Sequence, residues 1–509
     1  MTTDYRGYAT HPEQDPPVPG ARKVVIMGAG PAGLTAAWEL TRKGVPCEII
    51  EADPTEVGGI ARTASYKGFR FDIGGHRFFT KSAEIQRVWR EILPAEDWLH
   101  VSRMSRIYYK GKFFAYPLKA LDALSKLGVA TSALCVSSYA TARVFPRKEE
   151  RTFEDWIVNR FGERLYRIFF KTYTEKLWGM ACCDISADWA AQRIKGLSLT
   201  SAIRNALRPQ RGGGEGVIKT LIDQFDYPKY GPGMMWERAA EIVQQRDGVL
   251  HMGSPVVRLD HGDGLLRHVV ARNGTGELTA TGTDYISTLP IRTLVEMLHP
   301  APPPMVQAAA AALRYRDYLT VVLVLDRAEV FPDNWIYIHD PTVQLGRVQN
   351  FKNWSPFMVP DLAQTALGLE YFCTEGDGLW EAPDAELLAL GAHELAHIGL
   401  CRPGEVVDGT VVRMPKAYPV YDDQYKENVA LIRAWLAEHL GNLQLVGRNG
   451  MHKYNNQDHS MMAALLAARN ILGERWDPWK VNTDAEYHEE VKAGDDEAGR
   501  IMPRRLAVP

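Results

Sequence analysis

The sequence predicts an α/β fold made of more than one domain, and three observations carry that prediction. Near the N-terminus, residues 23–51 read as an apolar strand, a glycine-rich turn, a helix and a second strand. Residues 83–231 then change to helix-forming sequence with periodic apolar positions. Short apolar runs typical of strands return at 318–325 and 367–372. Together these features indicate a Rossmann-type domain with a helical insertion and a second, mainly antiparallel sheet.

Length and composition narrow the class of protein. The chain has 509 residues, of which 46% are hydrophobic and 24% charged, and its formal net charge is −3. A chain of this length exceeds what one hydrophobic core usually serves, and near-neutral charge argues against nucleic-acid binding by bulk electrostatics. The six cysteines form no C-x-x-C pair, and no metal-ligand spacing is visible among Cys and His. We therefore expect reduced thiols, a cytoplasmic location, no metal and no nucleic-acid partner.

The first motif is a glycine turn between a strand and a helix. The strand 23–27 is followed by Gly28, Gly30 and Gly33 in G-x-G-x-x-G spacing. Gly28 permits a tight turn, Gly30 lets the backbone approach a pyrophosphate, and Gly33 lets the helix and strand pack closely. Glu51 ends the second strand, 23 positions after Gly28, where an acid accepts hydrogen bonds from a ribose. The unit predicts dinucleotide binding, with the phosphates at the helix N-terminus.

A second glycine segment follows Glu51 almost at once and indicates which dinucleotide binds. Residues 57–63 read Val-Gly-Gly-Ile-Ala-Arg-Thr, and residues 68–76 read Gly-Phe-Arg-Phe-Asp-Ile-Gly-Gly-His. These segments resemble the second glycine motif of FAD-dependent amine oxidases, protoporphyrinogen oxidases and UDP-galactopyranose mutases. In those families the loop runs along the pyrophosphate and the flavin ring, so the resemblance implies FAD rather than a nicotinamide cofactor.

Four further segments are similar to motifs of UDP-galactopyranose mutases, in matching order. They are Lys-Thr-Tyr-Thr-Glu-Lys-Leu-Trp-Gly at 171–179, Gly-Arg-Val-Gln-Asn-Phe-Lys at 346–352, Ala-Tyr-Pro-Val-Tyr-Asp at 417–422 and Gly-Arg-Asn-Gly-Met-His-Lys-Tyr-Asn-Asn-Gln-Asp at 447–458. The likeness extends from residue 23 to residue 472. By it the chain resembles a UDP-galactopyranose mutase-like, FAD-dependent enzyme of the amine oxidase and protoporphyrinogen oxidase superfamily.

The resemblance implies a reaction and its reactants. In the mutases, N5 of the reduced flavin forms an adduct with a nucleotide-activated sugar, which then changes between pyranose and furanose forms without net redox change. The implied cofactor is FAD, active in its reduced form, with NAD(P)H as a candidate reductant. The implied small-molecule substrate is a nucleotide sugar, as in carbohydrate biosynthesis, and a homodimer is a candidate assembly.

The resemblance also carries roles over to matching residues. The catalytic candidates are Arg347, His76, Arg448 and Tyr454. The substrate-binding candidates are Tyr173, Trp178, Tyr418, Lys229 and Arg211. The cofactor-binding candidates are Gly28, Gly30, Pro31, Ala32, Gly33, Glu51, Gly58, Gly59, Arg62, Gly75, His76, Gly447, Arg448 and Asp458.

The sequence departs from the mutase pattern in two places. The mutases carry a second diphosphate arginine on a mobile loop, whereas the comparable stretch 227–236 has no arginine. Lys229, or Arg211 on a glycine-rich loop, is the candidate replacement. The last motif has His452 where tyrosine is expected and Asn456-Gln457 in place of Asp-Met. These changes leave the identity of the sugar open.

Two other interpretations also stay open at this point. An FAD-dependent oxidoreductase would take a hydride from a carbon–nitrogen or carbon–carbon bond of a small molecule. The loop 60–63 and the strand 284–290 fit that group as well as they fit the mutases. A flavin-stabilised scaffold without enzymatic activity is the third interpretation.

The domain organisation follows from these motifs. The expected parts are a disordered leader at 1–20, an FAD-binding domain at 21–82, 232–292 and 440–473, a mainly helical substrate domain at 83–231, a sheet-bearing substrate domain at 293–439 and a peripheral tail at 474–509. The longest uncharged stretch, 127–142, has 16 residues, fewer than the roughly 20 that a transmembrane helix needs. We expect a buried helix there, with a surface touching a membrane or a lipid-linked substrate as the alternative.

Overall fold

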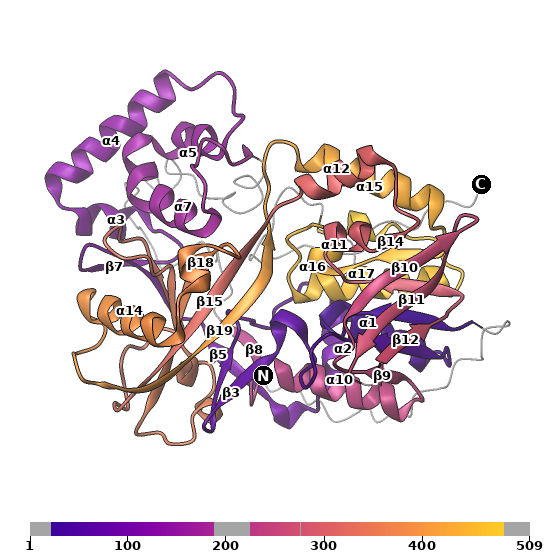
Figure 1. The fold of residues 1–509 in the computed structure, drawn as a ribbon. Coiled ribbons are helices and arrows are strands. Elements are labelled where there is room, and N and C mark those ends of the chain that lie inside the picture. Colours follow the sequence, from indigo (N-terminus) through magenta and orange to yellow (C-terminus); the bar gives the residue numbers. More distant parts are fainter. Residues whose placement is uncertain (1–21, 188–223, 275, 483–509) are drawn as a thin grey trace, which may run out of the picture.

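The structure is a computed structural model that describes residues 22–187, 224–274 and 276–482. Two sheets stand side by side, and a helical lobe rises above one of them (Figure 1). The predicted leader, the loop that holds Arg211 and most of the predicted tail lie outside the described residues. None of the described helices is long and apolar enough to span a bilayer.

The first sheet is parallel and five-stranded, with the order β20-β13-β1-β2-β9. Its strands are β1 (Val24–Met27), β2 (Cys47–Ile50), β9 (Val249–His251), β13 (Asp284–Ser287) and β20 (Leu443–Leu445). Alternate β1 side chains enter different cores, so Val24 and Ile26 face one side while Val25 and Met27 face the other. This is the Rossmann-type arrangement that the glycine motif predicts.

Helices and a small sheet cover the two faces of the parallel sheet. One core is shared by α1 (Pro31–Arg42), α2 (Ala83–Ile92), α10 (Gly233–Gln245) and α17 (Gln457–Ile471). The other core is shared by α11 (Ile291–Glu296), α12 (Pro304–Ala312), α15 (Tyr425–His439) and the four-stranded sheet of β10 (Val256–Gly262), β11 (Leu265–Asn273), β12 (Gly276–Ala280) and β14 (Leu298–His299). Because both faces are covered, the parallel strands are wholly buried.

The second sheet has seven strands in the order β19-β15-β18-β17-β16-β6-β7. They are β6 (Ser105–Tyr109), β7 (Lys112–Ala115), β15 (Tyr315–Leu325), β16 (Trp335–Ile338), β17 (Arg347–Asn350), β18 (Thr365–Cys373) and β19 (Val406–Pro419). All neighbouring pairs are antiparallel except β16 and β6. Helix α14 (Asp384–His397) packs on one face, which leaves the other face toward the aromatic core between the sheets.

The predicted helical segment 83–231 contains both helices and strands. Besides α2, its described helices are α3 (Ala120–Leu127), α4 (Val129–Val144), α5 (Phe153–Phe161), α6 (Glu163–Tyr166) and α7 (Thr172–Trp178). Its strands β6 and β7 extend the second sheet, while β5 (Trp98–Ser102) pairs with β8 (Gln224–Pro228). The stretch expected as a buried helix is α4, but it buries one side only, through Cys135, Tyr139 and Ala142.

Candidate active site

The glycine turn after β1 has the geometry that the motif requires. Gly28 has φ +101°, and a β-carbon there would lie 2.1 Å from Oγ1 of Thr288. A β-carbon on Gly33 would lie 1.9 Å from the carbonyl oxygen of Gly28, so only glycine lets α1 approach the turn. Gly30 differs, because the nearest atom to its added β-carbon is 3.9 Å away. The space in front of Gly30 is therefore free for a phosphate.

The N-terminus of α1 completes this anion site. Pro31 occupies the first turn, and the N-cap residue, Gly30, has no side chain to cap the helix. The unbonded N–H groups and the helix dipole are thus left for a ligand. Glu51 lies beside the turn: its Oε2 accepts from Ala29 N at 2.6 Å, and its Oε1 accepts from Asp53 N at 2.9 Å. These bonds hold the carboxylate at the end of β2, where a ribose would lie.

Two distant segments meet the same helix end. A β-carbon on Gly59 would lie 3.5 Å from Cα of Gly30, and one on Gly447 would lie 3.3 Å from Cβ of Ala32. Gly58 N–H donates to the carbonyl oxygen of Ala29 at 2.8 Å. Three predicted cofactor segments are therefore brought together around one cradle. Arg62 instead turns outward to Glu56, 2.8 Å away, and donates to the Gly59 carbonyl oxygen.

The loop 74–76 extends this cradle toward the second sheet. A β-carbon on Gly75 would lie 3.1 Å from Oε1 of Gln349, which lies on β17. His76 Nδ1 lies 2.8 Å from the Gly74 carbonyl oxygen, so Nδ1 carries the proton and Nε2 is the acceptor nitrogen. Burial and the positive charges of Arg448 and Arg347 lower the pKa of His76 to about 3. His76 is thus a neutral imidazole that feels the positive charge of both arginines.

Arg448 joins the cofactor cradle to a pair of stacked tyrosines. Its guanidinium donates to the carbonyl oxygens of Asn455 at 3.0 Å and Ala417 at 3.1 Å. It also lies 4.9 Å from the ring of Tyr454 and 5.6 Å from the ring of Tyr418, and the two rings are stacked at 5.6 Å. The backbone bonds fix the guanidinium, so its charge stays directed at this pair.

Arg347 is held from behind by a buried carboxylate. Its Nε donates to Oε2 of Glu370 at 2.8 Å, and its Nη2 donates to the same oxygen at 2.5 Å. The side chain of Glu370 is 1% exposed, while that of Arg347 is 19% exposed. Burial alone would lower the pKa of Arg347, but Glu370, Tyr173 and Tyr418 raise it well above its ordinary value. The guanidinium is a permanent cation. One edge is bonded to Glu370, and the other is accessible to a ligand.

Rings from the helical lobe and the second sheet surround Arg347. Tyr173 stacks on His339 at 5.0 Å and meets Tyr337 edge-on at 5.5 Å. Tyr337 in turn lies 5.9 Å from the Arg347 guanidinium. Trp178 packs edge-on against Tyr418 at 6.5 Å. Because Trp178 is only 2% exposed, it supports Tyr418 and does not itself face a ligand.

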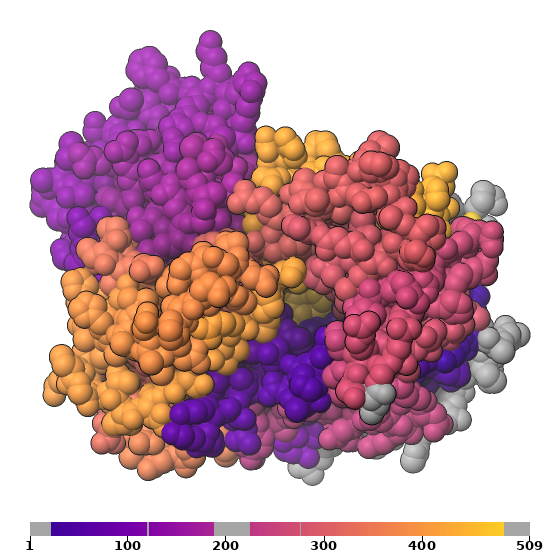
Figure 2. Space-filling model, in the orientation of Figure 1, coloured from indigo at the N-terminus to yellow at the C-terminus, as the bar shows by residue number. Residues whose placement is uncertain are grey.

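The molecule is hollowed where these parts of the chain meet. Figure 2 shows a depression between indigo N-terminal segments, orange segments of the second sheet and the red segments near α11. Arg347 is partly accessible although protein atoms desolvate it strongly, as expected for a group that lines a recess.

Not every predicted residue joins this group. The ammonium of Lys229 lies 4.5 Å from the ring of Phe357 and 5.3 Å from that of Tyr230, and none of the described contacts links it to Arg347. Arg211 lies outside the described residues. Asp458 is the second residue of α17 and is buried, but the cap is Asn456, which shares a capping box with His459. The role of Lys229 in substrate binding remains a prediction.

The sequence analysis overlooked the partners that hold Arg347 in place. Besides pairing with Arg347, Glu370 accepts a hydrogen bond from Gln349 Nε2. Oε1 of Gln349 is buried and has no hydrogen-bond partner among the described residues. A signal was present, because Glu370 is the one charged residue in the apolar run Thr365–Cys373. A carboxylate inside a buried strand needs a cation, and Arg347 lies directly across from it in the register of β17 and β18.

Comparison with known proteins places this geometry in context. Residues 31–472 match the family described as flavin containing amine oxidoreductase. A Klebsiella pneumoniae protein described as "Probable UDP-galactopyranose mutase" is 25% identical over 176 residues, which cover 33% of this chain and 43% of that relative. The chain therefore matches less than half of that relative's length.

Solved structures share the fold over most of the chain. The crystal structure of reduced UDP-galactopyranose mutase superposes with a TM-score of 0.77 at 23% identity, covering 89% of this chain and 96% of that one. Cyclohexylamine oxidase from Brevibacterium oxydans IH-35A gives a TM-score of 0.62 at 15% identity, covering 89% and 99%. At these identities the likeness establishes the fold, which a mutase and an oxidase share.

Proposed function

Because the chain belongs to the flavin containing amine oxidoreductase family, we propose that it is a flavin-dependent enzyme acting on a nucleotide-activated sugar. The reaction that we favour is a pyranose/furanose isomerisation like that of UDP-galactopyranose mutase. The observation that carries the proposal is the pair of fixed guanidiniums, Arg347 and Arg448, whose positive charges both act on a neutral His76. The likeness to a probable UDP-galactopyranose mutase and to the structure of reduced UDP-galactopyranose mutase supports the proposal.

The residues present fit FAD. The open space at Gly30, the uncapped start of α1 and the fixed carboxylate of Glu51 match a pyrophosphate and a ribose. Gly75 and His76 continue from this cradle toward Arg347, where a flavin ring would lie. When bound and reduced, FAD would supply a nucleophilic nitrogen to the sugar. NAD(P)H is the candidate source of electrons for that reduction.

The charges of the recess favour an anionic substrate. Arg347 and Arg448 contribute two positive charges, and Glu370 returns one negative charge from behind Arg347. A protonated amine would be repelled here, whereas a diphosphate would gain charge-assisted hydrogen bonds from a guanidinium fork. This electrostatic asymmetry is our reason to prefer a nucleotide diphosphate over an amine.

The chain's own groups then have distinct tasks. The open edge of Arg347 binds the diphosphate and offsets the charge that gathers on it as the bond to the sugar breaks. The rings of Tyr418 and Tyr454, which are stacked on each other, would hold the ligand and exclude water, and their hydroxyls would donate to phosphate oxygens. With Nδ1 bonded to Gly74, the unprotonated Nε2 of His76 would accept a hydrogen bond from the cofactor or the substrate. Tyr173 supplies a flat surface for the base or the sugar.

An anaerobic flavin spectrum, recorded while nucleotide sugars are added, tests the proposal. If the enzyme is a mutase, no sugar bleaches the oxidised flavin band, and isomerised sugar forms only after the flavin is reduced with dithionite. Bleaching of the oxidised band by a substrate would mean hydride transfer, and the oxidoreductase interpretation would replace ours. Binding of UDP to the oxidised enzyme, measured by calorimetry, tests the anion site separately from turnover.

A further inference from the structure

Helix α4 is apolar on two sides, although it lies on the molecular surface. One side, with Cys135 and Tyr139, packs against the lobe beneath it, through contacts with α5 and α6. The fourteen residues from Val129 to Ala142 contain no charged side chain. The exposed polar residues of this stretch are Ser137 and Thr141, and a surface helix that lacks a charged face is commonly covered by a partner.

The outer side of α4 exposes large apolar side chains. Val129 is 89% exposed, Val144 is 68% exposed, and Phe145 directly after the helix is 76% exposed. Leu134 and Val136 are exposed between them. These five residues are a third of the fifteen large hydrophobic side chains that are exposed in the described part of the chain, yet they lie within seventeen positions. Scattered apolar residues need no explanation, but such a concentration marks a contact surface.

Basic residues border this apolar surface. Arg143 lies in the last turn of α4, Lys148 follows that helix, Lys119 precedes the helix pair α3–α4, and Arg164 lies on the neighbouring helix α6. All four are exposed and form no ion pair with a described residue. Residues 119–167 hold nine Lys and Arg against six Asp and Glu, a net charge of +3, although the whole chain carries −3. The lobe is therefore the basic part of an acidic protein.

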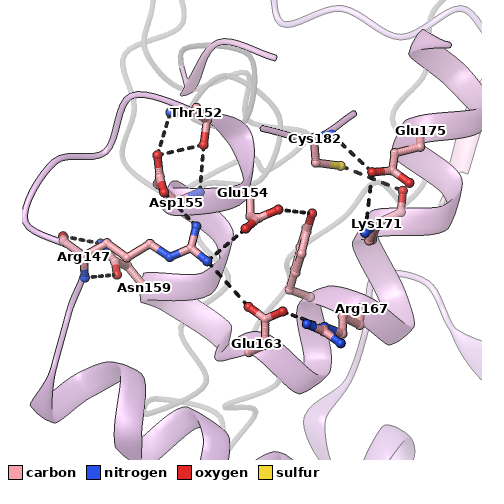
Figure 3. Close-up of polar contacts among 11 residues, drawn as sticks. Arg147, Thr152, Glu154, Asp155, Asn159, Glu163, Arg167, Lys171, Glu175 and Cys182 are labelled. Carbon is pink, nitrogen blue, oxygen red and sulfur yellow. Dashed lines mark hydrogen bonds and ion pairs between the residues drawn. The ribbon is translucent and has the colours of Figure 1, made fainter. Parts of the chain in front are cut away.

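The end of α4 is fixed to a rigid base. Arg147 donates to Oδ1 of Asp155 at 2.7 Å and to Oε1 of Glu154 at 2.9 Å, and Glu163 lies 3.6 Å from it (Figure 3). Asn159 adds hydrogen bonds to both the N–H and the carbonyl oxygen of Arg147. Because this network anchors the chain two residues after Phe145, the apolar side chains project from an ordered surface and cannot fold back into the lobe.

We propose that this lobe docks on an anionic lipid bilayer, with α4 lying flat at the interface. The uncharged stretch is about 21 Å long at 1.5 Å per residue, too short to cross the roughly 30 Å hydrocarbon core. Lying flat, it buries Val136, Val144 and Phe145 among the acyl chains while Arg143 and Lys148 meet lipid phosphates. Apolar burial and charge attraction together are what stable peripheral binding requires.

Sedimentation of the full-length, flavin-loaded protein with lipid vesicles tests the apolar part. Vesicles of 70% phosphatidylcholine and 30% phosphatidylserine should sediment the wild-type protein. Val136→Glu should reduce the bound-to-free ratio about tenfold or more, because a charge would enter the acyl region. Val407→Glu alters another exposed valine, on β19, and should leave the ratio unchanged. Equal losses in both variants, or no binding by the wild type, would overturn the proposal.

The basic border is tested with the same vesicles. Neutralising Arg143 and Lys148 to Gln should weaken binding roughly fivefold for each residue. Arg402→Gln removes an exposed charge far from the lobe in the sequence and serves as control. Binding that is equally strong on pure phosphatidylcholine, or unchanged in the double variant, would contradict the charge argument. If Val136→Glu instead converts a lipid-free dimer to a monomer in analytical ultracentrifugation, a second copy of the chain covers α4 and the bilayer proposal fails.

Discussion

Replacing Arg347 by alanine should weaken both the fold and the binding of nucleotide diphosphates, for different reasons. The substitution leaves the carboxylate of Glu370, 1% exposed, without the cation that now donates two hydrogen bonds to it. Removing one partner of a buried ion pair costs about 3–5 kcal/mol of unfolding free energy. Arg347 is 19% exposed, so water can reach the vacated space, and we expect a loss near 3 kcal/mol.

The double variant Arg347→Ala/Glu370→Gln separates the two effects. An amide at position 370 needs no cation, and Gln349 can turn its unbonded Oε1 toward the new NH₂ group. We therefore expect the double variant to regain about 1–2 kcal/mol of the lost stability. It should not regain UDP binding, which we expect to fall about 10- to 100-fold in both variants because charge-assisted hydrogen bonds to phosphate are lost.

Urea unfolding and calorimetric titration with UDP provide the two measurements. Arg413→Ala is the control, since it breaks another arginine–carboxylate pair, between β19 and Asp384 of α14, at 2.6 Å. Asp384 is exposed, so loss of the ion pair itself should cost under about 1 kcal/mol. Arg413 also donates to the Trp380 and Ala382 carbonyl oxygens, whose loss adds to that cost, and UDP binding should stay intact. Wild-type UDP affinity in Arg347→Ala, or recovery of UDP binding in the double variant, would refute our assignment of Arg347 to the anion site.

Three further predictions follow from packing and burial. A β-carbon at Gly33 would lie 1.9 Å from a backbone oxygen, so Gly33→Ala should yield protein without flavin. A β-carbon at Gly30 would have no atom nearer than 3.9 Å, so Gly30→Ala should fold and only lose flavin affinity. Equal flavin content in the two variants would contradict the assignment of this turn to the cofactor. Burial lowers the pKa of His339 to about 3 and that of His452 to about 4. As the pH falls below 6.5, these histidines become protonated in the unfolded chain before they do so in the folded one. The free energy of unfolding at pH 5 should therefore be about 2 kcal/mol lower per histidine than at pH 7. His339→Gln should reduce this difference between pH 7 and pH 5, measured by urea unfolding, by about 2 kcal/mol. The Lys176 ammonium donates to three backbone carbonyl oxygens, so Lys176→Met should lower the free energy of unfolding by about 2–3 kcal/mol. An unchanged urea midpoint would show that these three hydrogen bonds do not stabilise the fold.

Local sequence rules predicted the Rossmann-type fold around the glycine turn. The spacing of Gly28, Gly30 and Gly33 predicts a tight turn, an open approach and close packing. The clash that excludes a side chain at Gly33 is with Gly28 in the same turn, whereas the one at Gly28 is with Thr288, far away in the sequence. Glu51 follows from the same rule because it ends the adjacent parallel strand. In such a unit the sequence order and the spatial order coincide, so the pattern alone locates the site.

The substrate half depends on long-range pairing, which the sequence does not display. Strand β6 joins the second sheet beside β16, some 230 positions later, so the segment 83–231 could not be recognised as part of that sheet. Glu370 faces Arg347 only because β17 and β18 pair in one register, and a shift by one residue would turn the carboxylate to the opposite face. Lys229 directly follows β8 and lies beside the ring of Phe357, and its role toward the diphosphate stays a prediction.

The three departures from the mutase motif have structural partners in this chain. His452 is buried, with Nε2 at 3.2 Å from the Val420 carbonyl oxygen. Asn456 caps α17, and Gln457 accepts a hydrogen bond from Trp236 at 3.1 Å. Because each replaced side chain is used within the fold, these changes alter how the last motif is held and do not remove a charge from Arg347 or Arg448.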